Sequence, residues 1–138
     1  SPFTVREVET FHDDRGGALR GTNTVRIFTA GGLSVAHLGD LGHQLTVEQA
    51  AAIGPVDAVL VPVGGVYTVD AAGAKAVCDA LHPRCVVPMH YHHAPYGLTE
   101  VDSVEPFLEL WPAEEVHHLQ GAAFELTEQT AGVMVPSF

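Results

Sequence analysis

The sequence contains few cysteines and few basic residues, and both shortages narrow the range of functions. Its 138 residues include two cysteines, Cys78 and Cys85, which do not form a Cys-x-x-Cys pair. We therefore expect no thiolate zinc site, and both cysteines should be reduced and buried. Six basic residues stand against seventeen acidic ones, giving a formal net charge of -11 that repels phosphate backbones and anionic lipid surfaces. Neither nucleic acid nor a membrane is expected as a partner.

Long apolar runs are also missing. No segment approaches the roughly 20 apolar residues that span a bilayer. The first residues, Ser1-Pro2-Phe3, have neither the basic nor the apolar region of a signal peptide, and a cytoplasmic protein is expected. The sequence is nevertheless 46% hydrophobic, which is enough for one domain of this length to bury a core. No linker, repeat or composition shift marks a second domain.

The pattern along the chain predicts strands and helices of a mixed fold. Thr46 and Gln49 have the spacing of a capping box, and the unbroken apolar run Ala58–Val63 is typical of a strand covered on both faces. Helices are expected at about 46–53, 70–81 and 102–110, and strands at 3–11, 24–29, 33–38, 58–63 and 85–87. Three short antiparallel strands are expected at 116–119, 122–126 and 132–135.

Three strand-like segments each deliver a side chain that can bind a metal ion. His12 follows an alternating apolar and polar segment, Asp40 follows a mostly apolar one, and His90 ends the buried-strand pattern Val86–Met89. Strand ends are rigid positions for ligands, and histidine with aspartate suits zinc, manganese or iron. Each residue alone fits an ordinary loop or turn, and it is the set of three that predicts a metal site.

Four blocks of the sequence together resemble the metallo-β-lactamase fold hydrolases. The likeness is to the small metal-dependent hydrolases of that superfamily, the group that includes L-ascorbate-6-phosphate lactonase, and it covers nearly the whole chain. The blocks are, in order, His12-Asp13-Asp14-Arg15-Gly16-Gly17, His37-Leu38-Gly39-Asp40-Leu41-Gly42-His43, Pro62-Val63-Gly64-Gly65-Val66-Tyr67-Thr68 and Val87-Pro88-Met89-His90-Tyr91. The resemblance implies the α/β (α+β) fold class, with a mixed sheet and helices on one face.

The resemblance also implies roles for individual residues. His12 would be the third histidine of the first metal site, Asp40 the catalytic carboxylate that bridges both metals, and His90 the final histidine of the second site. The complete site would hold two divalent ions, with zinc favoured and manganese or iron as alternatives. The implied reaction is hydrolysis of a small-molecule substrate by a metal-bound water or hydroxide.

Other residues of the four blocks have implied roles near the site. Gly64 and Gly65 would let the backbone pass close to the site, and His43 and Tyr67 could face the substrate. A packed tyrosine and a solvent-exposed histidine explain the last two residues equally well. Four other histidines are assigned structural rather than functional roles, and they are His37, His82, His117 and His118.

The sequence departs from the family at one motif. Family members open with a half that carries an HxHxDH motif, which supplies four metal-site residues, and this sequence contains none. His90-Tyr91-His92-His93 lacks the aspartate and lies at the position of the last ligand, so it is no substitute. The resemblance therefore implies that residues 1–138 are a single partial domain, the second half of an αββα sandwich. Its open sheet face should need a partner, either the missing N-terminal half or a second copy, and we expect no stable free monomer.

Two further interpretations remain open beside the hydrolase, which could itself be inactive as an isolated fragment. The chain could be a non-catalytic binding or assembly module that has lost its metal site. It could also be a cupin-like metal barrel, because His90-x-His92 followed by Glu100 imitates that ligand pattern. The predicted β-α-β segment 58–87 argues against the barrel, since cupins are nearly all strand.

Overall fold

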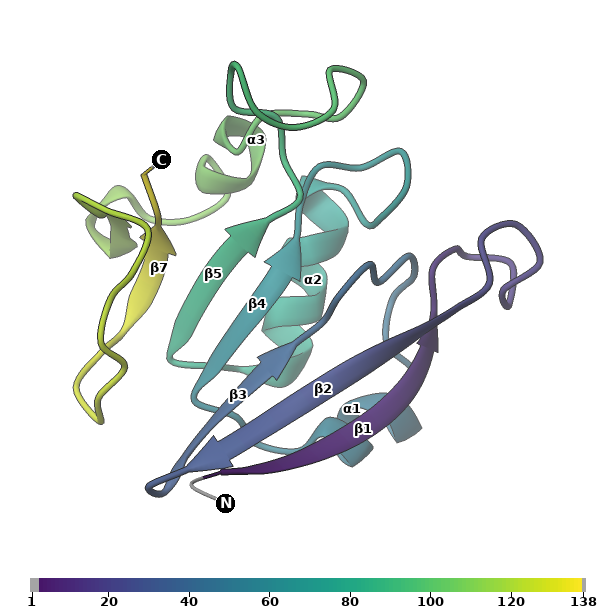
Figure 1. Cartoon of the computed structure of the whole chain (residues 1–138), viewed down its shortest axis with the longest axis horizontal. Helices are drawn as coiled ribbons and strands as arrows, with labels where there is room; N and C mark the ends of the chain where they lie inside the picture. Colours follow the sequence, from purple (N-terminus) through teal and green to yellow (C-terminus); the bar gives the residue numbers. More distant parts are fainter. Residues whose placement is uncertain (1–2, 138) are drawn as a thin grey trace.

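The structure is a computed structural model, and it describes residues 3–137. Within that range the strands form one seven-stranded sheet in the order β1-β2-β3-β4-β5-β7-β6 (Figure 1). The strands are β1 (Thr4–Phe11), β2 (Thr22–Ala30), β3 (Leu33–His37), β4 (Ala58–Pro62), β5 (Cys85–Met89), β6 (Val116–His118) and β7 (Gly132–Val135). The pairs β1/β2 and β2/β3 are antiparallel, and every later pair is parallel.

The helices are α1 (Val47–Ile53), α2 (Ala71–Leu81), α3 (Glu105–Leu108) and the 3-10 helix η1 (Ala113–Glu115). The first two begin and end at or next to the residues that the sequence marks. The capping box before α1 is complete, because Thr46 and Gln49 exchange side-chain to backbone hydrogen bonds of 3.0 and 3.1 Å. Asp70 caps α2 through the N–H of Gly73. Within residues 3–137, no helix has both the length and the apolar character needed to cross a bilayer.

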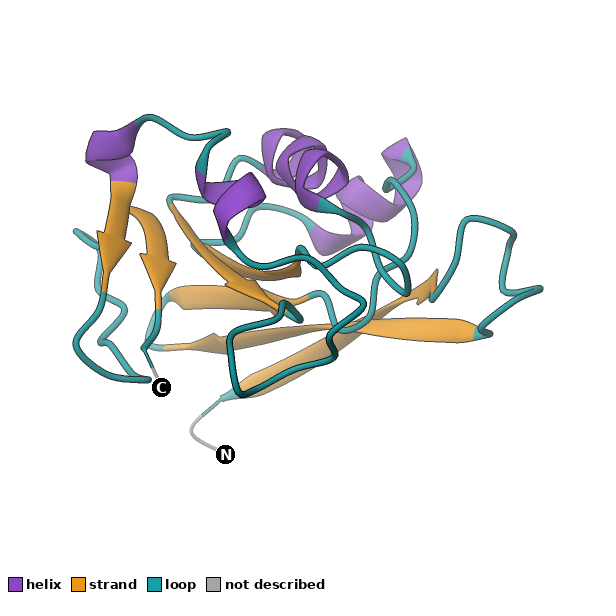
Figure 2. Ribbon diagram, turned by 90° about the horizontal axis from the view of Figure 1, so that it is seen from above, coloured by secondary structure: helices purple, strands orange, loops and turns teal. Residues whose placement is uncertain are grey.

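All the helices lie on one face of the twisted sheet, as Figure 2 shows. The main core fills the space between them and that face, where Ile27, Val59 and Val61 of the sheet lie in one cluster with Val77 of α2 and Phe107 of α3. Burial of these side chains is the main contribution to stability. The expected α/β class, with a mixed sheet and helices on one face, is confirmed.

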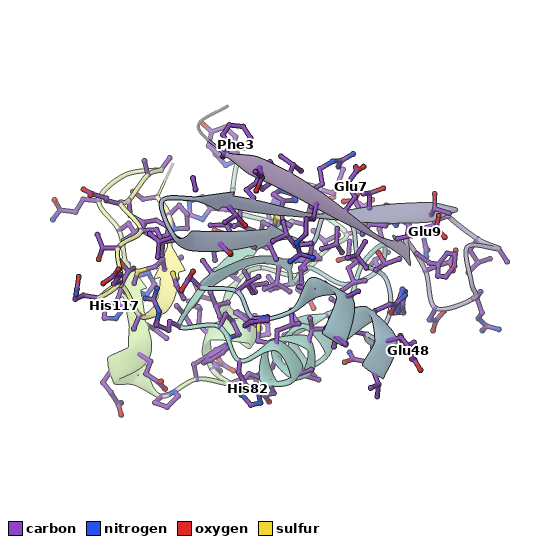
Figure 3. All side chains as sticks on the ribbon, turned by 90° about the horizontal axis from the view of Figure 1, so that it is seen from below. Phe3, Glu7, Glu9, Glu48, His82 and His117 are labelled. Carbon is purple, nitrogen blue, oxygen red and sulfur yellow. The ribbon has the colours of Figure 1, made fainter. Side chains whose placement is uncertain are left out.

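No helix formed by residues 3–137 covers the other face of the sheet (Figure 2). Leu119 and Leu126, from the segment between β6 and β7, pack there against a smaller cluster, which consists of Ala58, Cys85, Val87 and Met134. Figure 3 shows Phe3 and Glu7 on this side of the molecule, opposite Glu48 and His82 of the helical side. Towards β1 the face is hollowed by an apolar groove of about 320 Å³, and its lining residues are Phe3, Phe28, Ala30, Leu33, Val35 and Leu126.

The end of the chain differs from the sequence prediction in two ways. The strands at 116–119 and 132–135 were predicted to be antiparallel, but β6 and β7 pair in parallel, and residues 122–126 form no strand. Parallel neighbours need a long crossover, and residues 119–131 provide it while covering part of the open face. The helix expected at 102–110 is reduced to α3, and the N–H of Asp102 donates to the carbonyl of Gly64 in the loop before it.

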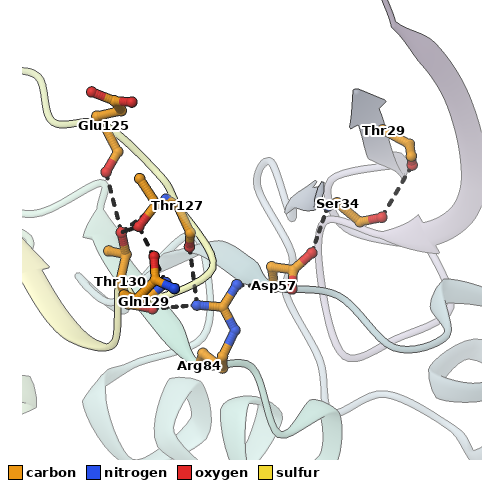
Figure 4. A network of polar contacts seen from close by, with 8 residues as sticks. All are labelled: Thr29, Ser34, Asp57, Arg84, Glu125, Thr127, Gln129 and Thr130. Carbon is orange, nitrogen blue, oxygen red and sulfur yellow. Dashed lines mark hydrogen bonds and ion pairs between the residues drawn. The ribbon is translucent and has the colours of Figure 1, made fainter. Parts of the chain in front are cut away.

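Arg84 anchors this crossover to the sheet (Figure 4). Its guanidinium donates to the carbonyl groups of Thr127 and Thr130 and forms an ion pair with Asp57 at 2.9 Å. The other oxygen of Asp57 accepts the N–H of Ser34 at 2.7 Å. The backbone N–H of Ser34 lowers the pKa of Asp57 most, and Arg84 lowers it further against the opposing effect of burial.

Both cysteines are free and buried, as predicted. Burial raises the pKa of Cys78 to about 12 and that of Cys85 to about 11. Because the thiolate is the reactive form of cysteine, neither side chain is a nucleophile at neutral pH.

Candidate metal centre

The predicted ligands meet because their strands end at the same edge of the sheet. β3, β4 and β5 run in the same direction, and β1 also does, since it is antiparallel to β2 and β2 to β3. His12 directly follows β1, Asp40 lies in the turn after β3, and His90 directly follows β5. Three residues far apart in the sequence are thereby brought to one place.

Asp40 lies between the two histidines. Its Oδ2 is 3.4 Å from Nε2 of His12, and its Oδ1 is 3.0 Å from Nε2 of His90. The side chain of His12 is 24% exposed and that of His90 is 48% exposed, so both rings can be reached from solvent. Each oxygen of one carboxylate therefore faces a different imidazole.

The turn that carries Asp40 is held by Asn23. The side-chain oxygen of Asn23 accepts the N–H of Asp40 at 2.9 Å, and its amide nitrogen donates to the carbonyl of Leu38 and to the hydroxyl of Thr10, both at 2.9 Å. Thr10 is fully buried. Asn23 is therefore a positioning residue that links β1, β2 and the Asp40 turn, and the sequence pattern did not reveal it.

Two glycines let loops lie directly against the histidines. A Cβ at Gly42 would overlap the backbone of His12, and a Cβ at Gly64 would overlap the carbonyl oxygen of His90. The close approach expected of Gly64 is confirmed. His90 itself has a left-handed backbone with φ of 54°, which is unusual for a residue other than glycine and is found often at functional sites.

Asp13 organises the loop between β1 and β2. Its buried carboxylate, 1% exposed, accepts four backbone N–H groups, from Arg15, Gly17, Leu19 and Arg20, at 2.7 to 2.9 Å. Burial alone would raise the pKa of this carboxyl, but the four hydrogen bonds outweigh it and hold the pKa well below its usual range. The loop from His12 to Gly21 is therefore a defined wall of the site.

A cavity of about 610 Å³ opens beside the three ligands. His12, Asp40 and His90 line it together with Tyr67, which was predicted to contact substrate. The hydroxyl of Tyr67 donates to Glu100 at 2.8 Å, and this bond raises the pKa of Tyr67 and lowers that of Glu100. The volume lies within the range of small-molecule sites, about 300–1,000 Å³.

His43 lies elsewhere. Its Nε2 accepts the N–H of Phe11 at 3.0 Å, and its Nδ1 lies 2.7 Å from the carbonyl of Gln44. It borders a separate hollow with Asp14 and Asp70. The structure therefore brings together four of the five predicted site residues, and within residues 3–137 His43 is not among those lining the large cavity.

The other walls of the cavity were not predicted from the sequence. Arg20, Tyr91, Leu98 and Val101 also line it. In the sequence, Arg20 has no feature that separates it from a solvated arginine, and Leu98 and Val101 lie outside any periodic segment. The Asp13-x-x-Gly16-Gly17 pattern of a tight loop is the signal that could have drawn attention to residues 13–21.

The donor set fits part of a two-metal site. Two imidazoles on opposite oxygens of one carboxylate are suitable ligands for two divalent ions that share a bridge. Among residues 3–137, no three histidine, cysteine or acidic side chains are arranged to hold a single ion. The Nδ1 atom of His12 is buried with no hydrogen-bond partner in the same range. The chain could thus supply one histidine to each of two ions and a carboxylate between them, and further ligands would have to come from outside this range.

Comparison with known proteins places the chain in a family. Residues 2–90 match the model of the beta-lactamase superfamily domain. A metal-dependent hydrolase of Carboxydothermus hydrogenoformans is 32% identical over 103 residues, which are 72% of this chain and 46% of that protein. Another, from Pyrococcus furiosus, is 33% identical over 101 residues, which are 68% of this chain and 45% of that protein. The chain spans about half the length of these curated relatives.

Solved structures agree with the family match. A crystal structure from Thermotoga maritima, described as a candidate zinc-dependent hydrolase of the metallo-beta-lactamase superfamily, superposes with a TM-score of 0.83 and 38% identity. The match covers 97% of this chain and 64% of that one. A candidate metal-dependent hydrolase from Parabacteroides distasonis shares the fold, with a TM-score of 0.63 and 14% identity.

The fold and the strand-end ligands define a metallo-β-lactamase type of protein. The chain belongs to the metallo-β-lactamase superfamily, in the family whose curated members are called metal-dependent hydrolases.

Proposed function

We propose that the chain is the ligand-bearing second half of a metal-dependent hydrolase that acts on a small-molecule substrate. One observation carries this proposal: Nε2 of His12 and Nε2 of His90 face the two oxygens of Asp40, in the wall of a cavity of about 610 Å³. His12 and His90 would each bind one of two divalent ions, and Asp40 would bridge them. The similar protein of Thermotoga maritima is described as zinc-dependent, which favours zinc.

The metals, when bound, would supply a water activated for attack on the substrate. The residues of this chain would do the rest. Asp40 would keep the two sites at a constant separation, and Leu98 and Val101 would exclude bulk water from one side of the cavity. Tyr67, fixed by its hydrogen bond to Glu100, would orient the substrate, and His43 would act further out, at the neighbouring hollow.

A complete site requires ligands from a second segment of polypeptide. The relatives are about twice as long as the matched region, and the open face of the sheet has an apolar groove where a second layer could pack. We propose that an N-terminal half, or a second copy of the chain, covers this face and completes the metal site.

Metal analysis of purified variants tests the proposal. The wild-type protein, together with the segment that completes its site, is stripped with a chelator, reloaded with Zn²⁺ and dialysed, and the bound metal is measured by mass spectrometry. We expect His12→Ala, His90→Ala and Asp40→Asn to lose at least half of the bound metal, because each change removes one ligand of the shared site. His118→Ala, an exposed histidine on β6, is the matched control and should retain the full amount.

A different result would favour a non-catalytic assembly module. That alternative rests on the finding that, within residues 3–137, no three metal-binding side chains surround one point. Equal metal contents in the wild type and all four variants would reject the metal site at Asp40 and leave the module as the better interpretation.

A further inference from the structure

Arg20 differs from every other basic residue between positions 3 and 137. The sequence has six basic side chains, and five of them have polar partners. Arg6 donates to two carbonyl groups at the end of α1, both at 2.8 Å. The other four form ion pairs with acids, namely Arg15 with Asp14, Arg26 with Glu7, Lys75 with Asp79 and Arg84 with Asp57. Among the described residues, no acidic side chain lies within 4.0 Å of the Arg20 guanidinium.

The guanidinium of Arg20 lies in the cavity that contains the metal ligands. It lies over the ring of Tyr67, 5.4 Å from the ring centroid, and both side chains line the cavity with His12, Asp40 and His90. Attraction to the aromatic face holds a guanidinium in place. The N–H groups of a planar guanidinium point outward from its edge, where they can donate in pairs to a carboxylate or phosphate.

Arg20 and Tyr67 are each anchored by hydrogen bonds to neighbouring residues. The backbone N–H of Arg20 donates to the buried carboxylate of Asp13 at 2.7 Å. The carbonyl of the next residue, Gly21, accepts the N–H of His12, and its own N–H donates to the carbonyl of Gly17. The ring of Tyr67 is fixed by the 2.8 Å bond from its hydroxyl to Glu100. A ligand therefore meets a guanidinium whose backbone is anchored and whose side chain rests on an anchored ring, which reduces the entropy lost on binding.

The net negative charge of the chain limits where an anion can bind. A chain with a net charge of -11 repels anions in general, so an anion enters the cavity only where a cation compensates it. Leu98 and Val101 form an apolar wall of the same cavity. An anionic group and an apolar body can thus be bound together.

We propose that Arg20 is a specificity-determining residue that binds the oxyanion of an organic substrate whose apolar body lies along Leu98 and Val101. This inference rests on the proposed function in one respect, since the bond to be hydrolysed would face His12, Asp40 and His90. Carboxylate and phosphate share the required chemistry, and the experiment below distinguishes them.

Calorimetric titration with three short probes tests the inference. Hexanoate and hexyl phosphate present an oxyanion on an apolar chain, and hexanamide presents the same kind of chain without charge. Titrations are made on the protein as purified and again after chelation, so that binding to a metal is separated from binding to Arg20. Arg20→Gln removes the charge, Arg20→Lys keeps the charge without the planar group, and Arg15→Gln is the matched control in the same loop.

The expected result is specific to charge and to position. The wild type and Arg15→Gln bind at least one of the two anions at least about tenfold more tightly than the amide, since hydrogen bonds to charged groups are the strong ones. Arg20→Gln removes this preference, and Arg20→Lys retains only part of it. The anion that shows the larger preference identifies the substrate class.

Three results would overturn the inference: no probe binds the wild type, the amide binds as tightly as both anions, or Arg20→Gln keeps the anion preference. Anion binding that disappears on chelation and in His90→Ala, but survives in Arg20→Gln, would place the anion on the metals and likewise reject a role for Arg20. Arg20-dependent binding in a protein that takes up no metal would support this inference while rejecting the hydrolase proposal.

Discussion

At the scale of single residues, the site depends on two positions where a side chain would not fit. Gly42 lies against the backbone of His12, and Gly64 lies against that of His90. The carbonyl of Gly64 also accepts the N–H of Asp102, which joins the 91–103 loop to the end of β4. Because each glycine contacts main chain rather than a movable side chain, a methyl group there must displace the histidine.

Replacing Gly64 with alanine tests this dependence. We expect Gly64→Ala to destabilise the fold by about 1–3 kcal/mol, the usual cost of forcing extra atoms into a packed region, and to weaken Zn²⁺ binding. Urea unfolding and metal titration measure the two effects. Gly121→Ala is the matched control, because a Cβ there meets nothing within 4 Å, and it should change stability by less than about 0.5 kcal/mol. Equal stability of the two variants would contradict the overlap.

At the scale of elements, Asp57 and Arg84 connect the start of β4, the start of β5 and the 119–131 crossover. The pKa of Asp57 is lowered in the folded protein, mainly by the N–H of Ser34. A depressed carboxyl pKa means that this stabilisation is present above the ordinary value of 3.8 and is lost as the pH falls through the folded pKa. The contacts of Asp57 with Ser34 and Arg84 should therefore be lost in acid and kept at neutral pH.

An Asp57→Asn variant should lack this pH-dependent contribution to stability. At neutral pH we expect it to be less stable than the wild type by about 1–3 kcal/mol, since a charged hydrogen-bonding group is removed. The difference should begin to shrink as the pH falls below 3.8, the ordinary pKa of the carboxyl, and should vanish below the lower pKa of the folded protein, where the wild-type carboxylate is protonated. Urea unfolding at a series of pH values measures it. Asp79→Asn, which removes an exposed partner of Lys75, is the control and should have the same stability as the wild type at each pH. If the stability difference between Asp57→Asn and the wild type did not change with pH, the pH dependence would not come from Asp57.

The elements that could be predicted from the sequence are those with a local signal. Capping residues and the apolar run of β4 located α1, α2 and a central strand, and strand ends drew attention to His12, Asp40 and His90. The parallel pairing of β6 with β7 could not be predicted, because it depends on how residues 119–131 cross a face that no local pattern describes. Asn23 and Arg20 were missed for the same reason, since their partners are distant in the sequence.

At the scale of the whole molecule, the two faces of the sheet are unequal. One is covered by α1, α2 and α3, and the other only in part, by Leu119 and Leu126. Near β1 the second face presents Val5, which is 45% exposed, beside the apolar groove. An apolar surface of this kind generally marks an interaction site.

The open face predicts self-association of the isolated chain. We expect analytical ultracentrifugation of the 138-residue chain to show species heavier than the monomer, and Val5→Glu to shift the distribution towards the monomer, because a buried unpaired charge opposes contact. Val47→Glu, on the helical face at a position that is 83% exposed, is the control and should leave the distribution unchanged. A wild-type chain that sediments only as a monomer would contradict the prediction.

The spacing of His12, Asp40 and His90 along the chain has a thermodynamic consequence. The long segments of chain between these residues keep the three groups apart in the unfolded chain. A ligand that needs all three therefore binds the native state alone. Such a ligand stabilises the native state in proportion to the logarithm of its concentration once the site is nearly saturated. The dissociation constant of such a ligand can therefore be obtained from the rise of the melting temperature of the entire sheet with ligand concentration.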